Sequence, residues 1–182
     1  MFLLILFLMC LFVAMGAGVM ASLSDYRGMV IPNSYSVIVI AAFVAAYALL
    51  WLFKHEGIFY GFGSHLLAAL LIFGITAGLF ALHAIGAADS KLASAFAFWM
   101  GLPGLISFVF YTSLVGGILA LGAIAIGKWK PFKAPKAGSW LARVQAGESK
   151  VPYGIAISAG ALASFVKLGY FDIETLRAFL SS

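Results

Sequence analysis

The chain has 182 residues, of which 64% are hydrophobic and only 9% are charged, and its mean hydropathy is +1.11. A chain of this composition lacks the polar surface that a soluble domain needs, so an ordinary soluble fold is excluded. Its long apolar runs do not alternate, which favours helices over a barrel. We therefore expect an all-α membrane protein, a polytopic bundle of about six transmembrane helices that forms a single domain over residues 1–182.

The first apolar run covers residues 1–24 and ends at the first charged residue, Asp25. No basic residue precedes the run, and it is longer than the core of a cleaved secretory signal, which has about 7 to 15 residues. We therefore expect a retained helix at 2–23. Hydropathy and turn residues predict five further spans, at 35–53, 64–82, 84–101, 104–127 and 152–170.

The fourth of these spans is the shortest in hydrophobic terms, because a purely apolar window starts only at Leu92. Counting residues 84–101 as helix gives 18 residues, or about 27 Å at 1.5 Å per residue, which is long enough to cross. On this interpretation Asp89 lies more than one turn inside the helix and faces the bundle or a water-filled cleft. Pro103 with Gly104 then marks the turn before the fifth span.

The net charge of +5 belongs to one segment, because the six bases and one acid of residues 128–150 account for all of it. The positive-inside rule places this basic loop, at about 128–151, in the cytoplasm. The connections at 24–34 and 83–91 then face the cytoplasm too, whereas both termini face outward. A nucleic-acid patch is the rival interpretation of such a cluster, but topology explains it next to membrane spans, and we expect membrane lipid and no nucleic acid as a partner.

The remaining residue types have structural explanations. Gly74 and Gly78 have the spacing of a close helix contact. The aromatic residues at span ends are expected to be interface anchors, namely Trp51, Phe53, Trp129 and Trp140. The three histidines are scattered and expected to be packing or interface residues, and Cys10 is the single cysteine, so no metal site, disulfide or cofactor is expected.

Three short motifs follow or open the predicted spans. Asp25 comes just after the first span and is followed by Ile31-Pro32-Asn33; Gly86-Ala87-Ala88-Asp89-Ser90-Lys91 opens the fourth span; Val151-Pro152-Tyr153-Gly154 opens the last. An ionisable residue at membrane depth is costly unless it is paired, wetted or used, which makes it a functional hypothesis. Two such acids on one side of the membrane suggest a catalytic pair.

Together, in this order and covering almost the whole chain, these motifs resemble those of the prepilin peptidases, a family of membrane aspartyl proteases. The resemblance implies that Asp25 and Asp89 are catalytic. It also implies a supporting role for the other motif positions, which are Ile31, Pro32, Asn33, Gly86, Lys91, Pro152, Tyr153 and Gly154. One position departs from the family pattern, since Ala88 stands where a glycine normally precedes the second aspartate.

The activity implied by the resemblance is removal of the basic leader that precedes the apolar helix of a type IV prepilin. Cleavage would occur at the cytoplasmic face of the bacterial inner membrane, with pilus assembly components as possible partners. The chain has one cysteine and only about 10 residues between its first two spans. It is therefore similar to the short peptidases of tight-adherence (Flp-type) pilus systems, which lack the cysteine-bearing cytoplasmic segment of the bifunctional members.

The chemistry of a carboxylate pair fits this activity. Two carboxylates that lie close together cannot both ionise easily, so one holds a proton near neutral pH while the other is an anion. The anion can take a proton from water and the protonated partner can polarise the scissile carbonyl. The two groups titrate as a pair, so acid and base are not assigned to either residue. Lys91 points about 200° away from Asp89 on an ideal helix and is expected to extend to the lipid headgroups.

Each acid taken alone also has a plain structural explanation. Asp25 could pair with Arg27 at the interface, and Asp89 could pair with Lys91 or cap a helix starting at Ser90. Two other function classes also stay open at this point. One is a small ion- or proton-coupled transporter or channel; the other is a catalytically inactive pilus assembly subunit, which Ala88 makes conceivable.

Overall fold

The computed structural model describes residues 1–55 and 57–181, and within these ranges the regular structure is entirely helical. The helices are α1 (Phe2–Gly28), α2 (Asn33–Leu52), α3 (Phe62–Ala81), α4 (Ala87–Trp129), α5 (Trp140–Gln145), α6 (Tyr153–Lys167) and α7 (Ile173–Ser181). In the described part of the chain, α1 to α4 are long and apolar enough to cross a membrane, and α6 is a shorter apolar helix. The expected polytopic α-helical bundle is confirmed.

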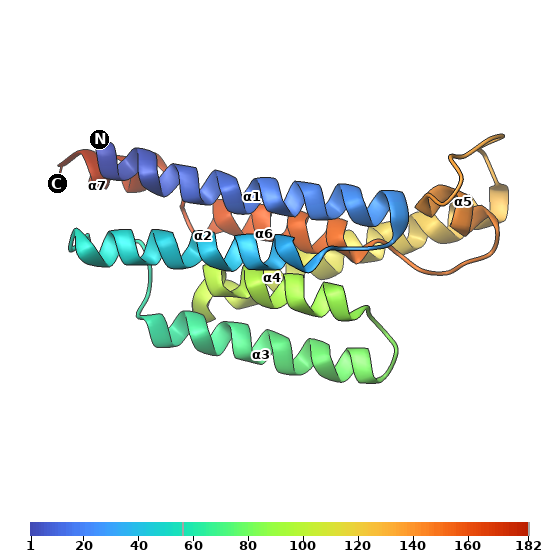
Figure 1. Ribbon diagram of the computed structural model, residues 1–182, viewed down its shortest axis with the longest axis horizontal. Helices are drawn as coiled ribbons and strands as arrows, with labels where there is room; N and C mark the ends of the chain where they lie inside the picture. Colours follow the sequence, from blue (N-terminus) through green and yellow to red (C-terminus); the bar gives the residue numbers. More distant parts are fainter. Residues whose placement is uncertain (56, 182) are drawn as a thin grey trace.

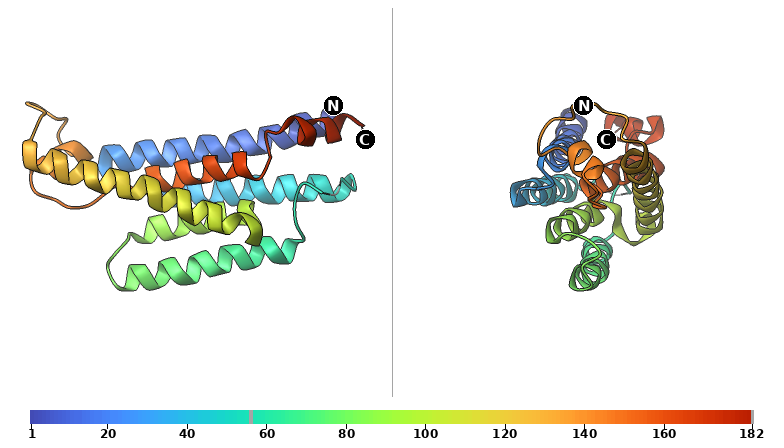
Figure 2. Two further views of the ribbon diagram at one scale, coloured as in Figure 1. Left: turned by 180° about the vertical axis from the view of Figure 1, so that it is seen from behind. Right: turned by 90° about the vertical axis from the view of Figure 1, so that its right-hand side faces the viewer.

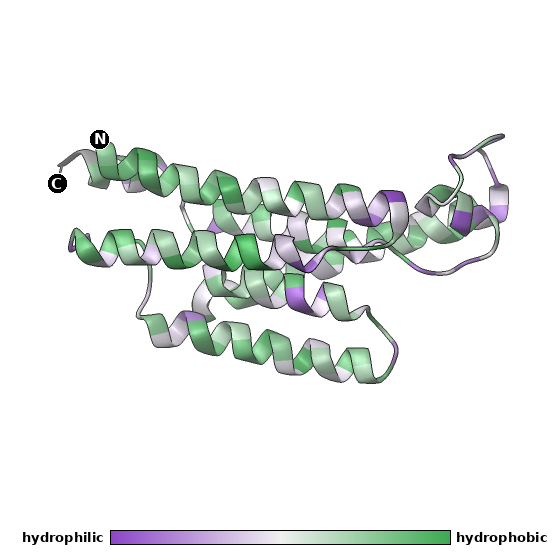
Figure 3. Cartoon of the chain, in the orientation of Figure 1, coloured by the Kyte–Doolittle hydropathy of each residue, from purple (hydrophilic) through white to green (hydrophobic). Residues whose placement is uncertain are grey.

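The long helices and α6 lie lengthwise beside one another (Figures 1 and 2). One end of the bundle, here called the terminal end, holds both chain ends, α7 and the α2–α3 connection. The other end, here called the α5 end, holds the α1–α2 and α3–α4 connections and α5. Hydrophilic residues are concentrated at the α5 end, whereas the helices between the ends are mostly hydrophobic (Figure 3).

Helix α4 reverses direction at Gly101, whose backbone angles (φ 58, ψ 178) are not helical. A first arm, 87–100, and a second arm, 102–129, run in opposite directions on either side of it (Figure 2). The expected fourth and fifth spans are therefore both present, but the reversal is at Gly101 and not at Pro103 with Gly104. A side chain would be strained at this φ, and a Cβ would lie 3.3 Å from both His65 Cε1 and Ser64 Oγ.

The reversal interrupts the hydrogen-bond ladder of α4, and the start of α3 supplies new partners. Ser64 Oγ accepts a hydrogen bond from the N–H of Leu102 at 3.0 Å. His65 Nδ1 lies 2.6 Å from the carbonyl oxygen of Phe98 and, when protonated, donates to it. His65 is fully buried among aromatic rings, which include those of Phe43 and Phe59. The histidine is thus a packing residue, as expected, and it also completes the turn.

A third partner comes from the chain beyond α6. The carbonyl of Trp99 has no helical partner, because the chain reverses at Gly101 and residue 103 belongs to the second arm. The hydroxyl of Tyr170 donates to this carbonyl at 2.6 Å instead, and Tyr170 is only 1% exposed. Because unsatisfied backbone groups are costly in an apolar interior, Ser64, His65 and Tyr170 allow the chain to reverse within the bundle.

The first arm of α4 begins at Ala87, whereas the expected helix began at residue 84, so Asp89 lies in the first turn and not more than one turn inside. The arm is about 21 Å long and the neighbouring α3 about 30 Å. Thr76 of α3 faces Ser90, with 2.7 Å between their hydroxyl oxygens, and α3 continues to Ala81. The last turn of α3 therefore extends past Asp89, which leaves a recess beside the aspartate.

Two further expectations about packing are wrong. Gly74 and Gly78 have open space where a Cβ would stand, so they make no close helix contact within the chain. Close helix contact, which we expect of the glycines in the other apolar runs too, is made by Gly160 of α6, where a Cβ would lie 2.7 Å from the backbone N of Thr112. Trp140 is only 6% exposed, unlike Trp51 at 76%, because it packs in a cluster at the α5 end with Val144 and Ala123.

Replacing Tyr170 by Phe tests the role of its hydroxyl at the reversal. The ring is preserved, but the carbonyl of Trp99 loses its donor and stays buried, so the free energy of unfolding is expected to fall by about 1 to 3 kcal/mol. Unfolding in detergent micelles measures this change. Tyr111→Phe is the matched control, because the hydroxyl of Tyr111 makes no hydrogen bond within the described residues. Equal losses in the two variants would contradict the assignment.

Candidate active site

Asp25 and Asp89 line the same cavity, which has a volume of about 920 Å³ and opens at the α5 end. The cavity is bounded by the end of α1 and the residues after it, the α3–α4 connection, the start of α4 and the segment before α6. Its wall is partly apolar, with Met29, Val30 and Phe80 among its members. The two acids that are 64 positions apart in the sequence (89 minus 25) thus face one recess.

Asp25 lies in the last turn of α1, which extends to Gly28 and so beyond the expected end of the first span. The side chain is only 5% exposed. Its Oδ2 accepts a hydrogen bond from the N–H of Gly154 at 2.8 Å. A Cβ on Gly154 would lie 3.0 Å from this oxygen and 2.9 Å from Ile31 Cδ1. The glycine therefore allows the amino end of α6 to approach the carboxylate of Asp25.

Asp89 lies at the third position of α4, where an acid commonly binds back to the start of its helix. Its Oδ2 accepts a hydrogen bond from the N–H of Gly86 at 3.0 Å. Both aspartates thus use Oδ2 to bind a glycine N–H at the beginning of a helix, and within the described residues neither Oδ1 has a hydrogen-bond partner.

The electrostatics of the cavity favour one negative charge over two. Helix amino ends carry a partial positive charge that stabilises a nearby anion. Burial of a carboxylate opposes its ionisation, and two ionised carboxylates that face one recess repel each other. Two acids in this setting share a proton more readily than they both ionise.

Lys91 is not among the residues that line the cavity, and it binds the start of α2 where we expected it to reach the lipid headgroups. Its Nζ donates a hydrogen bond to Asn33 Oδ1 at 3.1 Å, which ties the start of α2 to the first turn of α4. The predicted supporting residues therefore divide into three groups. The first group lines the cavity and consists of Ile31, Gly86 and Tyr153. The second, Asn33 with Lys91, joins the elements beside it. The third stands at helix starts, where Pro32 precedes α2, Pro152 precedes α6 and Gly154 binds Asp25.

The sequence interpretation missed four polar cavity residues, namely His83, Arg143, Ser149 and Lys150. His83 lies two residues after α3, with a positive φ of 58°, and we expect it from the sequence to be a packing or interface residue. Arg143 and Lys150 were counted only as topological charge. A local signal was available for their segment, because Ser139 precedes an apolar Trp-Leu pair and caps α5 by accepting from the N–H of Ala142.

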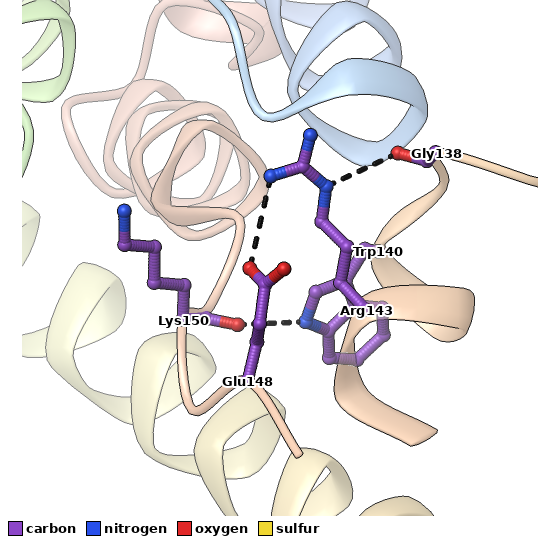
Figure 4. Close-up of polar contacts among 5 residues, drawn as sticks. All are labelled: Gly138, Trp140, Arg143, Glu148 and Lys150. Atoms are coloured by element: carbon purple, nitrogen blue, oxygen red, sulfur yellow. Dashed lines mark hydrogen bonds and ion pairs between the residues drawn. The ribbon is translucent and has the colours of Figure 1, made fainter. Parts of the chain in front are cut away.

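The segment 138–150, called here the basic strap, is folded against the bundle (Figure 4). The indole N–H of Trp140 donates to the carbonyl of Lys150 at 3.0 Å, and the Trp140 ring packs near that of Tyr26, the residue after Asp25. Arg143 Nε donates to the carbonyl of Gly138 at 3.3 Å. These contacts fix the residues that lead into α6.

The described residues contain no group of three or more histidine, cysteine, aspartate or glutamate side chains that could hold a metal ion. Two carboxyl groups with unbonded oxygens can hold a water molecule, exchange a proton with it and polarise a carbonyl group.

A family model described as the type IV leader peptidase family matches residues 4–121. The match covers more than half of the chain and includes Asp25, Asp89 and the motif residues around both. Pro152, Tyr153 and Gly154 lie outside the matched range, so their place at the cavity comes from the structure. No curated protein and no solved structure gives a significant match.

Trp140→Phe is expected to loosen the start of α6 without unfolding the bundle. The variant keeps an aromatic ring but loses the hydrogen bond to Lys150, which is worth about 1 kcal/mol. Amides of residues 151–154 should then exchange with deuterium about fivefold faster, as measured by mass spectrometry. Trp129→Phe, at a position that is 74% exposed, should leave these amides unchanged, and protection retained in Trp140→Phe would refute the coupling.

Proposed function

The chain is a multi-pass membrane protein of the type IV leader peptidase family, and we therefore propose that it is an aspartyl endopeptidase. Its proposed substrate is a type IV prepilin, from which it removes the basic leader at the cytoplasmic face of the bacterial inner membrane. The observation that carries the proposal is the cavity shared by Asp25 and Asp89. The family match favours hydrolysis over ion transport for this pair.

In the proposed mechanism the two aspartates share one proton and bind a water molecule with their free oxygens. The ionised carboxylate removes a proton from the water as it attacks the scissile carbonyl, while the protonated partner donates a hydrogen bond to the carbonyl oxygen. The proton then passes to the leaving amine as the carbon–nitrogen bond breaks. The glycine N–H groups of residues 86 and 154 hold the two Oδ2 atoms in place during these steps.

We assign the chain to the short peptidases, whose prepilin substrates are Flp-like, because residues 29–32 alone separate α1 from α2. The apolar helix of the prepilin would lie beside the membrane-spanning helices, and the leader junction would unwind into the cavity. The net positive charge of residues 128–150 supports a cytoplasmic position for this end of the bundle. Pilus assembly components remain possible partners.

Ala88 is compatible with an active site of this kind. It is half-buried and packs against the hydrophobic core, and the bond between Gly86 and Asp89 forms with alanine in the intervening position. This geometry supports a functional enzyme over an inactive assembly subunit.

Asp25→Asn and Asp89→Asn are each expected to lower kcat for leader removal by about 10²- to 10⁴-fold, because each variant removes one partner of the proton exchange. The assay incubates purified protein in detergent with a prepilin and determines the mass and new N-terminus of the product. Asp172→Asn is the control, since Asp172 lies at the opposite end of the chain's fold beside α7. Full processing by the double Asn variant would end the proposal.

Gly154→Ala tests the support of Asp25 while leaving both carboxyl groups present. The added methyl group would force Asp25 or Ile31 to move, and a displacement of about 1 Å at a reacting group costs on the order of 10²-fold in rate. We expect kcat to fall by this amount while the protein stays inserted and folded. Gly117→Ala places the same methyl group in open space and should cleave at the parental rate; equal rates for both variants would argue against this role of Gly154.

A further inference from the structure

The charged groups of the cavity are arranged in two sets. The acids Asp25 and Asp89 come from α1 and α4, whereas the basic strap contributes Arg143 and Lys150. The proposed hydrolysis uses only the acids. The two cations therefore line the cavity without a role in the chemistry.

Lys150 has a fixed backbone and an unpaired side chain. Its carbonyl is held by the indole of Trp140, so the residue has a defined position at the cavity. Within the described residues its ammonium group forms no ion pair and no hydrogen bond. The backbone thus carries the structural role of the residue, which leaves the charge available to a ligand.

Arg143 is paired only loosely. Its Nη1 lies 3.7 Å from Glu148 Oε2, and the two side chains are 37% and 45% exposed. An ion pair with this exposure contributes little to stability, so a ligand carboxylate can replace Glu148. Arg143 and Lys150 extend to the same side of the strap with Glu148 between them (Figure 4).

A substrate segment that enters the cavity must pass these cations. A positive side chain would be repelled by Lys150 and Arg143, whereas a carboxylate would gain a partner that the protein does not supply. A charge set apart from the reacting atoms discriminates by binding and not by chemistry.

We propose that Lys150, assisted by Arg143, is a specificity-determining residue that binds an acidic side chain in the substrate segment occupying the cavity. The inference rests on the proposed function and adds the chemistry of the substrate to it. It also fixes the direction of the bound segment, because the basic leader must leave the cavity away from the strap while the acidic residue lies against it.

A charge exchange between enzyme and substrate tests the proposal. Each acidic residue near the scissile bond of a prepilin is changed in turn to Lys, and each substrate is incubated with the parent protein and with Lys150→Glu. At one substrate position, we expect the change to Lys to raise the KM of the parent protein about tenfold. Lys150→Glu should show the same rise in KM for the unchanged prepilin, and kcat should stay nearly constant in both cases. Lys150→Glu combined with the Lys substrate should recover most of the affinity.

Two controls separate this result from general effects of charge. Lys133→Glu makes the same charge change at an exposed strap-flanking position that does not line the cavity, and it should keep the parental KM. The assay is repeated in nanodiscs with zwitterionic and with anionic lipid. A rise in the KM of Lys150→Glu that occurs only with anionic lipid, and that no substrate change corrects, would overturn the proposal in favour of a headgroup site.

A binding measurement distinguishes failure of this inference from failure of the proposed function. The dissociation constants of the same substrates are measured with the Asp25→Asn/Asp89→Asn protein, with and without Lys150→Glu. If Lys150→Glu weakens binding of the unchanged prepilin and restores binding of the Lys substrate, the inference is supported even when the parent protein cleaves nothing. Cleavage by the parent protein with identical constants for Lys150→Glu on every substrate overturns the inference alone.

Discussion

The structure depends on how a helix can reverse inside an apolar bundle without leaving backbone groups unpaired. Gly101 provides the backbone angles, and Ser64, His65 and Tyr170 provide the missing partners. This reversal ends the first arm of α4 early at one end, and the start at Ala87 shortens it at the other. Because α3 is longer than the arm it packs against, the α5 end contains a recess that side chains do not fill. The cavity is thus a consequence of helix lengths.

Two helix amino ends also lie at the cavity. The first arm of α4 and the short helix α6 both begin there, and each presents a glycine N–H to one aspartate. Burial of a carboxylate is unfavourable, and these bonds together with the helix dipoles offset part of that cost. Two acids that face one recess also repel each other when both are ionised, which favours a single negative charge on the pair. An arrangement that compensated both charges fully would be more stable and less suited to proton exchange.

The sequence predicted the class of fold and the residues that gather at the cavity, because apolar runs and short motifs are local properties. It failed where a single local bond or a tertiary contact decides the outcome. Residues 84–86 are apolar enough to belong to a helix, but the bond from Gly86 to Asp89 sets the start of α4 later. Pro103 is the obvious turn residue, yet it lies in the first turn of the second arm, where a proline needs no N–H. The reversal occurs at Gly101, where Tyr170 supplies a donor to the carbonyl of Trp99. Helix α5 has only six residues, too few for a periodic pattern, so the burial of Trp140 had no clear signal.

The basic strap shows why charge counting alone could not assign Arg143 and Lys150. The positive-inside rule applies to every lysine and arginine between residues 128 and 150 equally, and it gives no reason to separate Lys150 from Lys133. The separation comes from the indole of Trp140, which holds the carbonyl of Lys150 four residues before the glycine that binds Asp25. A change in the strap therefore acts on the cation and on the start of α6 together. Selection of a substrate and support of the aspartate pair are physically linked through this short stretch of chain.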